Sequence, residues 1–120
     1  MLKILDELSA SVISAINAIL QYEYLYKRIS IYSDARDNFR TFQKVAGRYQ
    51  ISQEQLNKIT ELLTLAENHK KSPLEFTRNN KIIIMSDNLR TDTLTIDKTK
   101  EFLLETKDFL RKISLKLGHI

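Results

Sequence analysis

Glycine and proline are almost missing from this chain, which has two glycines and one proline among 120 residues. An all-β domain needs a turn residue every few positions, whereas long helices need few such residues. A length of 120 residues fits one domain of ordinary size. We therefore expect a single all-α domain over residues 1–120, built as a bundle of four to five helices.

The first predicted helix, residues 2–29, is apolar on more than one face. One stripe of side chains follows the three- and four-residue steps of an α-helix: Leu5, Leu8, Val12, Ala15, Ile16, Ile19, Tyr22, Tyr26 and Ile29. Ile4, Ile13, Leu20, Tyr24 and Leu25 lie off this stripe and widen the apolar surface. Such a helix needs cover on more than one side. It is either the central helix of the bundle or part of an oligomer interface.

The same segment resembles neither a membrane-spanning helix nor a signal peptide. Lys3, Asp6 and Glu7 interrupt its start, and polar residues interrupt its uncharged stretch. We expect no membrane partner. The absence of cysteine excludes disulfides, thiolate metal sites and cysteine nucleophiles, and a cytoplasmic location is the simplest expectation.

Two further helices are predicted from their capping residues. Ser33 can cap a second helix that stops at Gly47, since glycine tolerates the left-handed conformation that ends many helices. Ser52 and Gln55 match a capping box at the start of a third helix. Pro73 disfavours the helical conformation of the residue before it, so this helix should end near residues 69–71.

The helical period fails between residues 71 and 94. The apolar run Ile82-Ile83-Ile84-Met85 and the following polar residues permit a small β-hairpin, with a long loop packed on the bundle as the alternative. Long irregular segments in a compact domain are often functional. A last helix should start near Thr95 and stop at Gly118.

The sequence contains no complete catalytic or metal-binding motif. Two glycines cannot form a glycine-rich phosphate loop, and the only histidines, His69 and His119, have no metal-site spacing. We expect His69 to be solvated at the end of the third helix, and we expect no metal and no cofactor. An enzyme is the least favoured hypothesis. Its test residues are Arg78 as anion binder, Glu75 and Asp87 as acid or base, and His69 as proton shuttle.

A basic segment around residues 69–90 makes RNA or DNA binding an alternative function. The net charge is +4, which is a mild preference for anionic partners. Basic side chains could hold phosphate oxygens while an aromatic ring stacks on bases, and the candidate residues are Lys70, Lys71, Phe76, Arg78, Lys81 and Arg90. The other interpretation is a solvated loop with Phe76 in the core.

Tyrosines gather at the end of the first helix. Tyrosine supplies a large amphipathic contact area and is enriched at protein interfaces. Tyr22 and Tyr26 share one helix face while Tyr24 points elsewhere, so at least one should lie outside the core. The interface candidates are Tyr22, Tyr24, Leu25, Tyr26 and Tyr32. We therefore predict a non-enzymatic interaction or accessory module, homodimeric or bound to another protein.

The order of the elements resembles the HEPN superfamily, whose members are small helical bundles that often dimerise. Its ribonuclease members carry an arginine, a polar residue, about four more residues and then a histidine. Arg78-Asn79 matches the opening of that motif, but Ile84 stands at the histidine position. The resemblance thus implies a member without this ribonuclease activity, of the kind that acts as a binding or accessory module beside nucleotidyltransferases. A HEPN-like ribonuclease with a divergent site is the alternative.

Overall fold

The computed structural model describes residues 2–72, 74–78, 81–85 and 90–118. Within these ranges the α-helices are α1 (Leu2–Leu25), α2 (Ala35–Val45), α3 (Gln53–Lys71) and α4 (Ile96–Leu117). A short 3₁₀ helix, η1 (Ala46–Tyr49), follows α2, and the strands are β1 (Leu74–Arg78), β2 (Lys81–Met85) and β3 (Thr91–Leu94). The expectation of a mainly helical domain is confirmed.

A three-stranded sheet replaces the predicted long loop or small hairpin, so the all-α class was only roughly right. The strands are antiparallel in the order β1-β2-β3. The expected hairpin corresponds to β2 and β3, and β1 is the strand that was not predicted. Ile82 and Ile84 are buried because alternate side chains of β2 face the helices. Leu94 of β3 completes this apolar face of the sheet.

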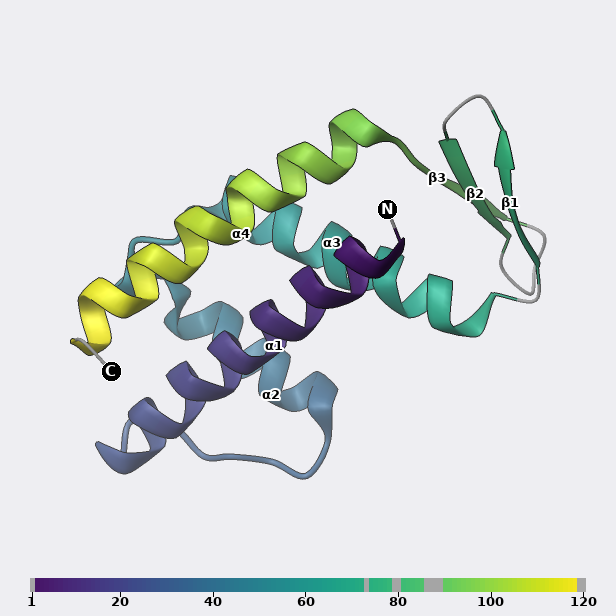
Figure 1. Cartoon of the computed structure of the whole chain (residues 1–120). Coiled ribbons are helices and arrows are strands. Elements are labelled where there is room, and N and C mark those ends of the chain that lie inside the picture. Colours follow the sequence, from purple (N-terminus) through teal and green to yellow (C-terminus); the bar gives the residue numbers. More distant parts are fainter. Residues whose placement is uncertain (1, 73, 79–80, 86–89, 119–120) are drawn as a thin grey trace.

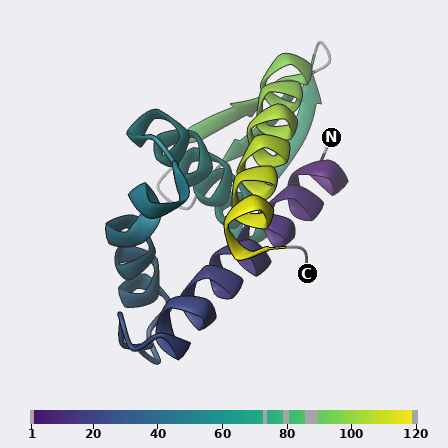
Figure 2. The ribbon, with the colours of Figure 1, turned by 90° about the vertical axis from the view of Figure 1, so that its left-hand side faces the viewer.

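The molecule is elongated, with principal extents of 48 × 28 × 23 Å. In Figure 1, α1 and α4 run in the same direction and the sheet lies beyond the N-terminal end of α1. The C-terminal end of α1 lies at the opposite end of the molecule, and the segment that follows runs back along one side to α2. Figure 2, turned by 90°, shows α2 and α3 following one another on one side of α1. The sheet and the C-terminal end of α1 are therefore separate regions at two ends of the bundle.

The core follows the predicted stripe of α1. Val12 and Ile19 are fully buried, and α1 contacts α2, α3 and α4, which agrees with a central position in the bundle. Phe42 of α2 and Phe109 of α4 meet edge to face with ring centroids 6.0 Å apart. The stripe does not extend to residue 29 as predicted, because α1 ends at Leu25.

The capping residues were predicted well for α3 and α4 and less well for α2. The Ser52 and Thr95 hydroxyls accept backbone N–H bonds in the first turns of α3 and α4. At α2 the cap is Asp34, which accepts from the Arg36 N–H, and not Ser33. Gly47 does not end the helical segment either, since η1 continues to Tyr49. Gln50 takes the left-handed conformation that was expected of Gly47.

Of the helices in the described ranges, α1 is the one long and apolar enough to cross a membrane by length and composition. The core helix of a globular protein can have the same length and apolar composition. The buried stripe of α1 packs on three other helices here, which is typical of a core helix.

Candidate interaction surfaces

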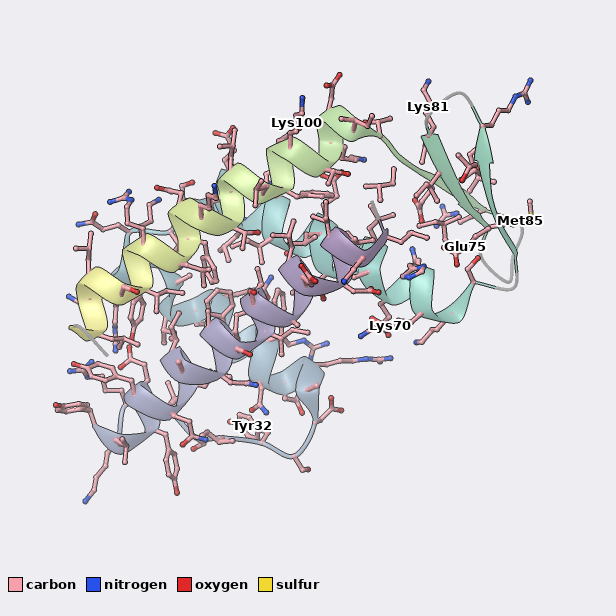
Figure 3. All side chains as sticks on the ribbon, viewed as in Figure 1. Tyr32, Lys70, Glu75, Lys81, Met85 and Lys100 are labelled. Carbon is pink, nitrogen blue, oxygen red and sulfur yellow. The ribbon has the colours of Figure 1, made fainter. Side chains whose placement is uncertain are left out.

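The predicted interface residues lie at the turn from α1 into α2. Tyr24, Leu25, Tyr26 and Tyr32 are exposed, at 51%, 73%, 59% and 50%, whereas Tyr22 is half-buried. We call residues 22–32 the aromatic corner. Figure 3 shows Tyr32 on the segment that leads from α1 toward α2. Four of the five interface candidates thus present large apolar side chains to solvent.

A buried carboxylate lies directly beneath this corner. Glu23 lies near the end of α1, and its side chain has no exposed surface. Its two oxygens pair with two arginines. The Arg28 Nη1 donates to one at 2.8 Å and the Arg48 Nη1 donates to the other at 3.1 Å. The carboxylate therefore ties the end of α1 to the following turn and to η1.

Aromatic rings pack on the same arginine. The guanidinium of Arg28 lies 5.1 Å from the Tyr26 ring centroid, and the Tyr22 and Tyr26 centroids are 4.8 Å apart.

The Tyr49 hydroxyl is buried and has no hydrogen-bond partner in the described part of the chain. Burial, together with the Glu23 carboxylate, raises the pKa of Tyr49 to about 12. Tyr49 is therefore neutral at physiological pH.

The backbone of the corner is closed by a defined helix stop. Lys27 has a positive φ of 57°, and the N–H groups of Lys27 and Arg28 donate to the carbonyls of Tyr24 and Glu23. This pair of bonds is the Schellman pattern that ends many helices. Farther on, the backbone of Tyr32 exchanges two hydrogen bonds of 2.8 Å with the Asn38 side chain. Lys27 thus gives α1 a defined end, and Asn38 holds the backbone of Tyr32 on the segment that follows.

Glu23 was not predicted from the sequence, although a signal was present. Glu23 follows Ile19 by four residues and Ile16 by seven, so it lies on the buried stripe. A carboxylate at such a position needs a cationic partner nearby, and Arg28 is five residues away. The second partner, Arg48, could not be inferred, because only the fold brings it to the end of α1.

The predicted basic segment is divided between two ends of the sheet. The register places Arg78 opposite Lys81 at one end, whereas Leu74, Met85 and Thr91 align at the other end. Four residues of strand separate the two ends by about 13 Å. Figure 3 shows Lys81 and Met85 at these opposite ends.

The remaining basic candidates belong to the end that adjoins α3. Lys70 and Lys71 are in the last turn of α3, and Arg90 directly precedes Thr91. The Lys71 ammonium pairs with Glu67 at 2.7 Å. The side chain of Phe76 lies outside the described part of the structure. The six candidates therefore do not form a single cluster.

His69 is not solvated as we expected, because it joins α3 to the sheet. Its side chain is 18% exposed, and its Nδ1 lies 2.6 Å from a Glu75 carboxylate oxygen. Its Nε2 lies 3.5 Å from Asp6 of α1. Asn68 donates in parallel to Asp92 at 2.9 Å. Glu75 and Asp92 flank Ile84 in the register of the sheet, so these two contacts attach the sheet to α3.

This arrangement does not bring together the described residues of the enzyme hypothesis. His69 and Glu75 meet, but both ring nitrogens of His69 face carboxylates, which leaves neither nitrogen open to a substrate. Arg78 follows Glu75 by three residues, so it points to the opposite face of the sheet about 10 Å away. Asp87 lies outside the described residues. Nor do the described ranges group three histidine or carboxylate side chains so that they could hold a metal ion.

The chain matches no family model, and no curated protein and no solved structure is significantly similar to it.

Proposed function

We propose that this chain is a non-enzymatic interaction module that forms a homodimer through the aromatic corner. The observation that carries the proposal is the exposure of Tyr24, Leu25, Tyr26 and Tyr32 at the end of α1 and on the segment that follows it. Large apolar side chains that remain exposed together typically mark protein contact sites.

The size of the exposed surface fits an interface. At roughly 200 Å² for each tyrosine side chain, the three exposed tyrosines leave about 300 Å² in contact with water. Leu25 and Ile31, exposed at 73% and 36%, add to this area. A standard interface covers about 800 Å² per partner, of which about three-fifths is apolar. Taken together, the exposed side chains of the corner carry an area comparable to the apolar part of such an interface.

The charges beneath the corner support the same proposal. A buried ion pair is weak evidence for stability, because well-packed apolar residues of similar volume often stabilise a fold as much or more. The Glu23–Arg28–Arg48 group instead fixes the direction of a turn whose rings point outward. An interface that is fixed before binding loses less conformational entropy when the partner arrives.

A matched pair of variants tests the proposal. Leu25→Asp alters the corner, and Leu104→Asp on α4 is its control, since Leu104 is a leucine of similar exposure, 68%. Sedimentation velocity should show a dimer for the wild type and for Leu104→Asp, and a monomer for Leu25→Asp. A wild-type chain that stays monomeric at high concentration would refute the homodimer.

One observation favours nucleic-acid binding as the second candidate function. Arg78 and Lys81 are exposed and stand directly opposite each other across β1 and β2. Like charges in this position destabilise a hairpin, so an anion bound between them would stabilise it. A labelled single-stranded oligonucleotide should then bind at low salt and dissociate steeply as salt rises. Charge reversal at both residues should abolish binding, while the control Lys44→Glu on α2 should not.

The proposal includes a cytoplasmic location without membrane partners, which the sequence favours. The resemblance to HEPN bundles implies dimerisation and an accessory role, which agrees with the proposed homodimer. Because Ile84 occupies the histidine position and is fully buried, a ribonuclease of that type would need a divergent site.

A further inference from the structure

An open groove runs along α1 on a surface other than the aromatic corner. Its walls come from α1, α2 and α3, and its volume is about 890 Å³. Apolar side chains from all three helices form the floor: Ile13, Ile16, Leu20, Phe39 and Leu63. Ile13 is 44% exposed, so the floor is open to solvent. None of the exposed residues of the corner lines the groove.

The groove has the length of a short helix. Its lining extends along α1 from Ser9 to Leu20, which is about 16 Å or three helical turns. On α3 it extends from Thr60 to Lys71, which is a similar length. A groove with an apolar floor and these dimensions suits the apolar face of a partner helix, whose anchors recur every three to four residues.

The rim of the groove is predominantly basic. Arg36, Arg40, Lys70 and Lys71 line it, against two carboxylates, Asp34 and Glu67. Both carboxylates already have partners within this chain. Asp34 caps α2, and Glu67 pairs with Lys71. Arg40 in turn lies 3.6 Å from Asp37, so the rim offers positive charge chiefly through Arg36 and Lys70.

The pKa of Glu67 is lowered by the same basic side chains of the rim. The hydrogen bond from Lys71 lowers the pKa of Glu67, and the charges of Lys71, Arg36 and Lys70 lower it further. Arg36 belongs to α2 whereas the lysines belong to α3, so basic groups stand on both sides of the groove.

We propose that this groove binds an acidic amphipathic helix of a partner protein. Leucine-like side chains on one face of that helix would fill the floor between Ile13 and Leu63. Glutamate or aspartate residues beside that face would pair with Arg36 and Arg40 on one side and with Lys70 on the other. The proposed homodimer at the corner is independent of this site.

A second copy of the chain fits the groove less well. In a two-fold symmetric dimer the same surface is used by both subunits. Groove against groove would bring the four basic side chains of one rim toward those of the other, in a chain of net charge +4. Repulsion of this kind selects against self-pairing and in favour of an acidic partner.

Three synthetic helical peptides test the proposal with the full-length chain. They share leucines at every third and fourth position and differ only in the flanking residues, which are glutamate, glutamine or lysine. By fluorescence anisotropy, the glutamate peptide should bind at least about tenfold more tightly than the lysine peptide, and added salt should reduce the difference. Equal binding of the three peptides, or binding by none, overturns the proposal.

Matched variants locate the binding. Ile13→Asp should weaken the binding of the glutamate peptide about tenfold or more. Ile4→Asp is the control, because Ile4 is on the same helix with 43% exposure and does not line the groove. Arg40→Glu with Lys70→Glu should remove the preference for glutamate, whereas Lys100→Glu on α4 should retain it. If Ile4→Asp weakens binding as much as Ile13→Asp, the groove is not the site. If Ile13→Asp changes the sedimentation of the chain alone, the occupant is a second copy.

Discussion

The buried Glu23–Arg28–Arg48 group predicts that the loss of its positive charges destabilises the fold more than the loss of its negative charge. Replacing both Arg28 and Arg48 with methionine should destabilise the fold far more than replacing Glu23 with methionine. The Glu23 side chain has no exposed surface, whereas the arginine side chains are 42% and 52% exposed. Without the arginines the carboxylate is buried and unpaired. Without the carboxylate the two guanidinium groups can turn toward water.

The expected magnitudes differ by several kilocalories. Removing the partners of a buried charge costs about 3–5 kcal/mol, so we expect about 3 kcal/mol for the double arginine variant, since solvent already screens the arginines. For Glu23→Met we expect a change within about 1 kcal/mol of wild type, because an apolar side chain of similar volume replaces a charge that was costly to bury. Each single arginine variant should lie between these values.

Urea unfolding followed by circular dichroism measures the difference. With a slope of about 1.5 kcal/mol per molar urea, a loss of about 3 kcal/mol lowers the midpoint by about 2 M. Glu23→Met should keep a midpoint near that of wild type. A Glu23→Met variant as destabilised as the double arginine variant would contradict this expectation, since the carboxylate would then stabilise the fold by more than its pairing.

Three further predictions concern single groups. Because burial raises the pKa of Tyr49 to about 12, stability should be retained below about pH 10 and fall as the pH rises through 12, and Tyr49→Phe should remove this fall and the latest step in the absorbance titration of the tyrosines. Hydrogen bonds from Arg111 and then Gln55 lower the pKa of Asp108 to about 2, so its contribution should be present above about pH 4 and lost as the pH falls toward 2. Its side chain is 38% exposed, so acid unfolding of Asp108→Asn should differ from wild type by only about 0.5 kcal/mol. Ser52→Ala should cost about 1 kcal/mol in urea unfolding through the lost cap of α3, and an unchanged midpoint would contradict that role.

Local signals in the sequence predicted most of the helices. The stripe of α1, the Ser52 cap and the Thr95 cap depend on residues within a few positions of each other, so no knowledge of the fold was needed. The second half of the predicted capping box is not formed, because the Gln55 side chain bonds Asp108 and Lys112 of α4. The end of α1 was misplaced because Lys27, and not a glycine, takes the left-handed conformation. That choice is costly for a lysine and has no clear sequence signal.

Contacts between distant segments could not be predicted in the same way. Strand β1 starts at Leu74, and it pairs with β2, whose residues 81–85 lie farther along the chain. His69 was predicted to be solvated at a helix end, because only the fold brings Glu75 to within 2.6 Å of it. The groove needs three helices in place before Ile13 and Leu63 face the same space.

The stability and the association of Glu23→Met, measured on one protein, separate two roles of the buried charge. If the charge group only holds the fold together, a variant of wild-type stability should dimerise like the wild type. If it fixes the corner for a partner, the same variant should fold normally and associate more weakly, because Tyr26 and Arg28 lose the contact that orients them. Apolar packing can replace the energy of an ion pair, but it cannot replace the direction that two hydrogen bonds give to a guanidinium. The second outcome is the one that the geometry of the aromatic corner favours.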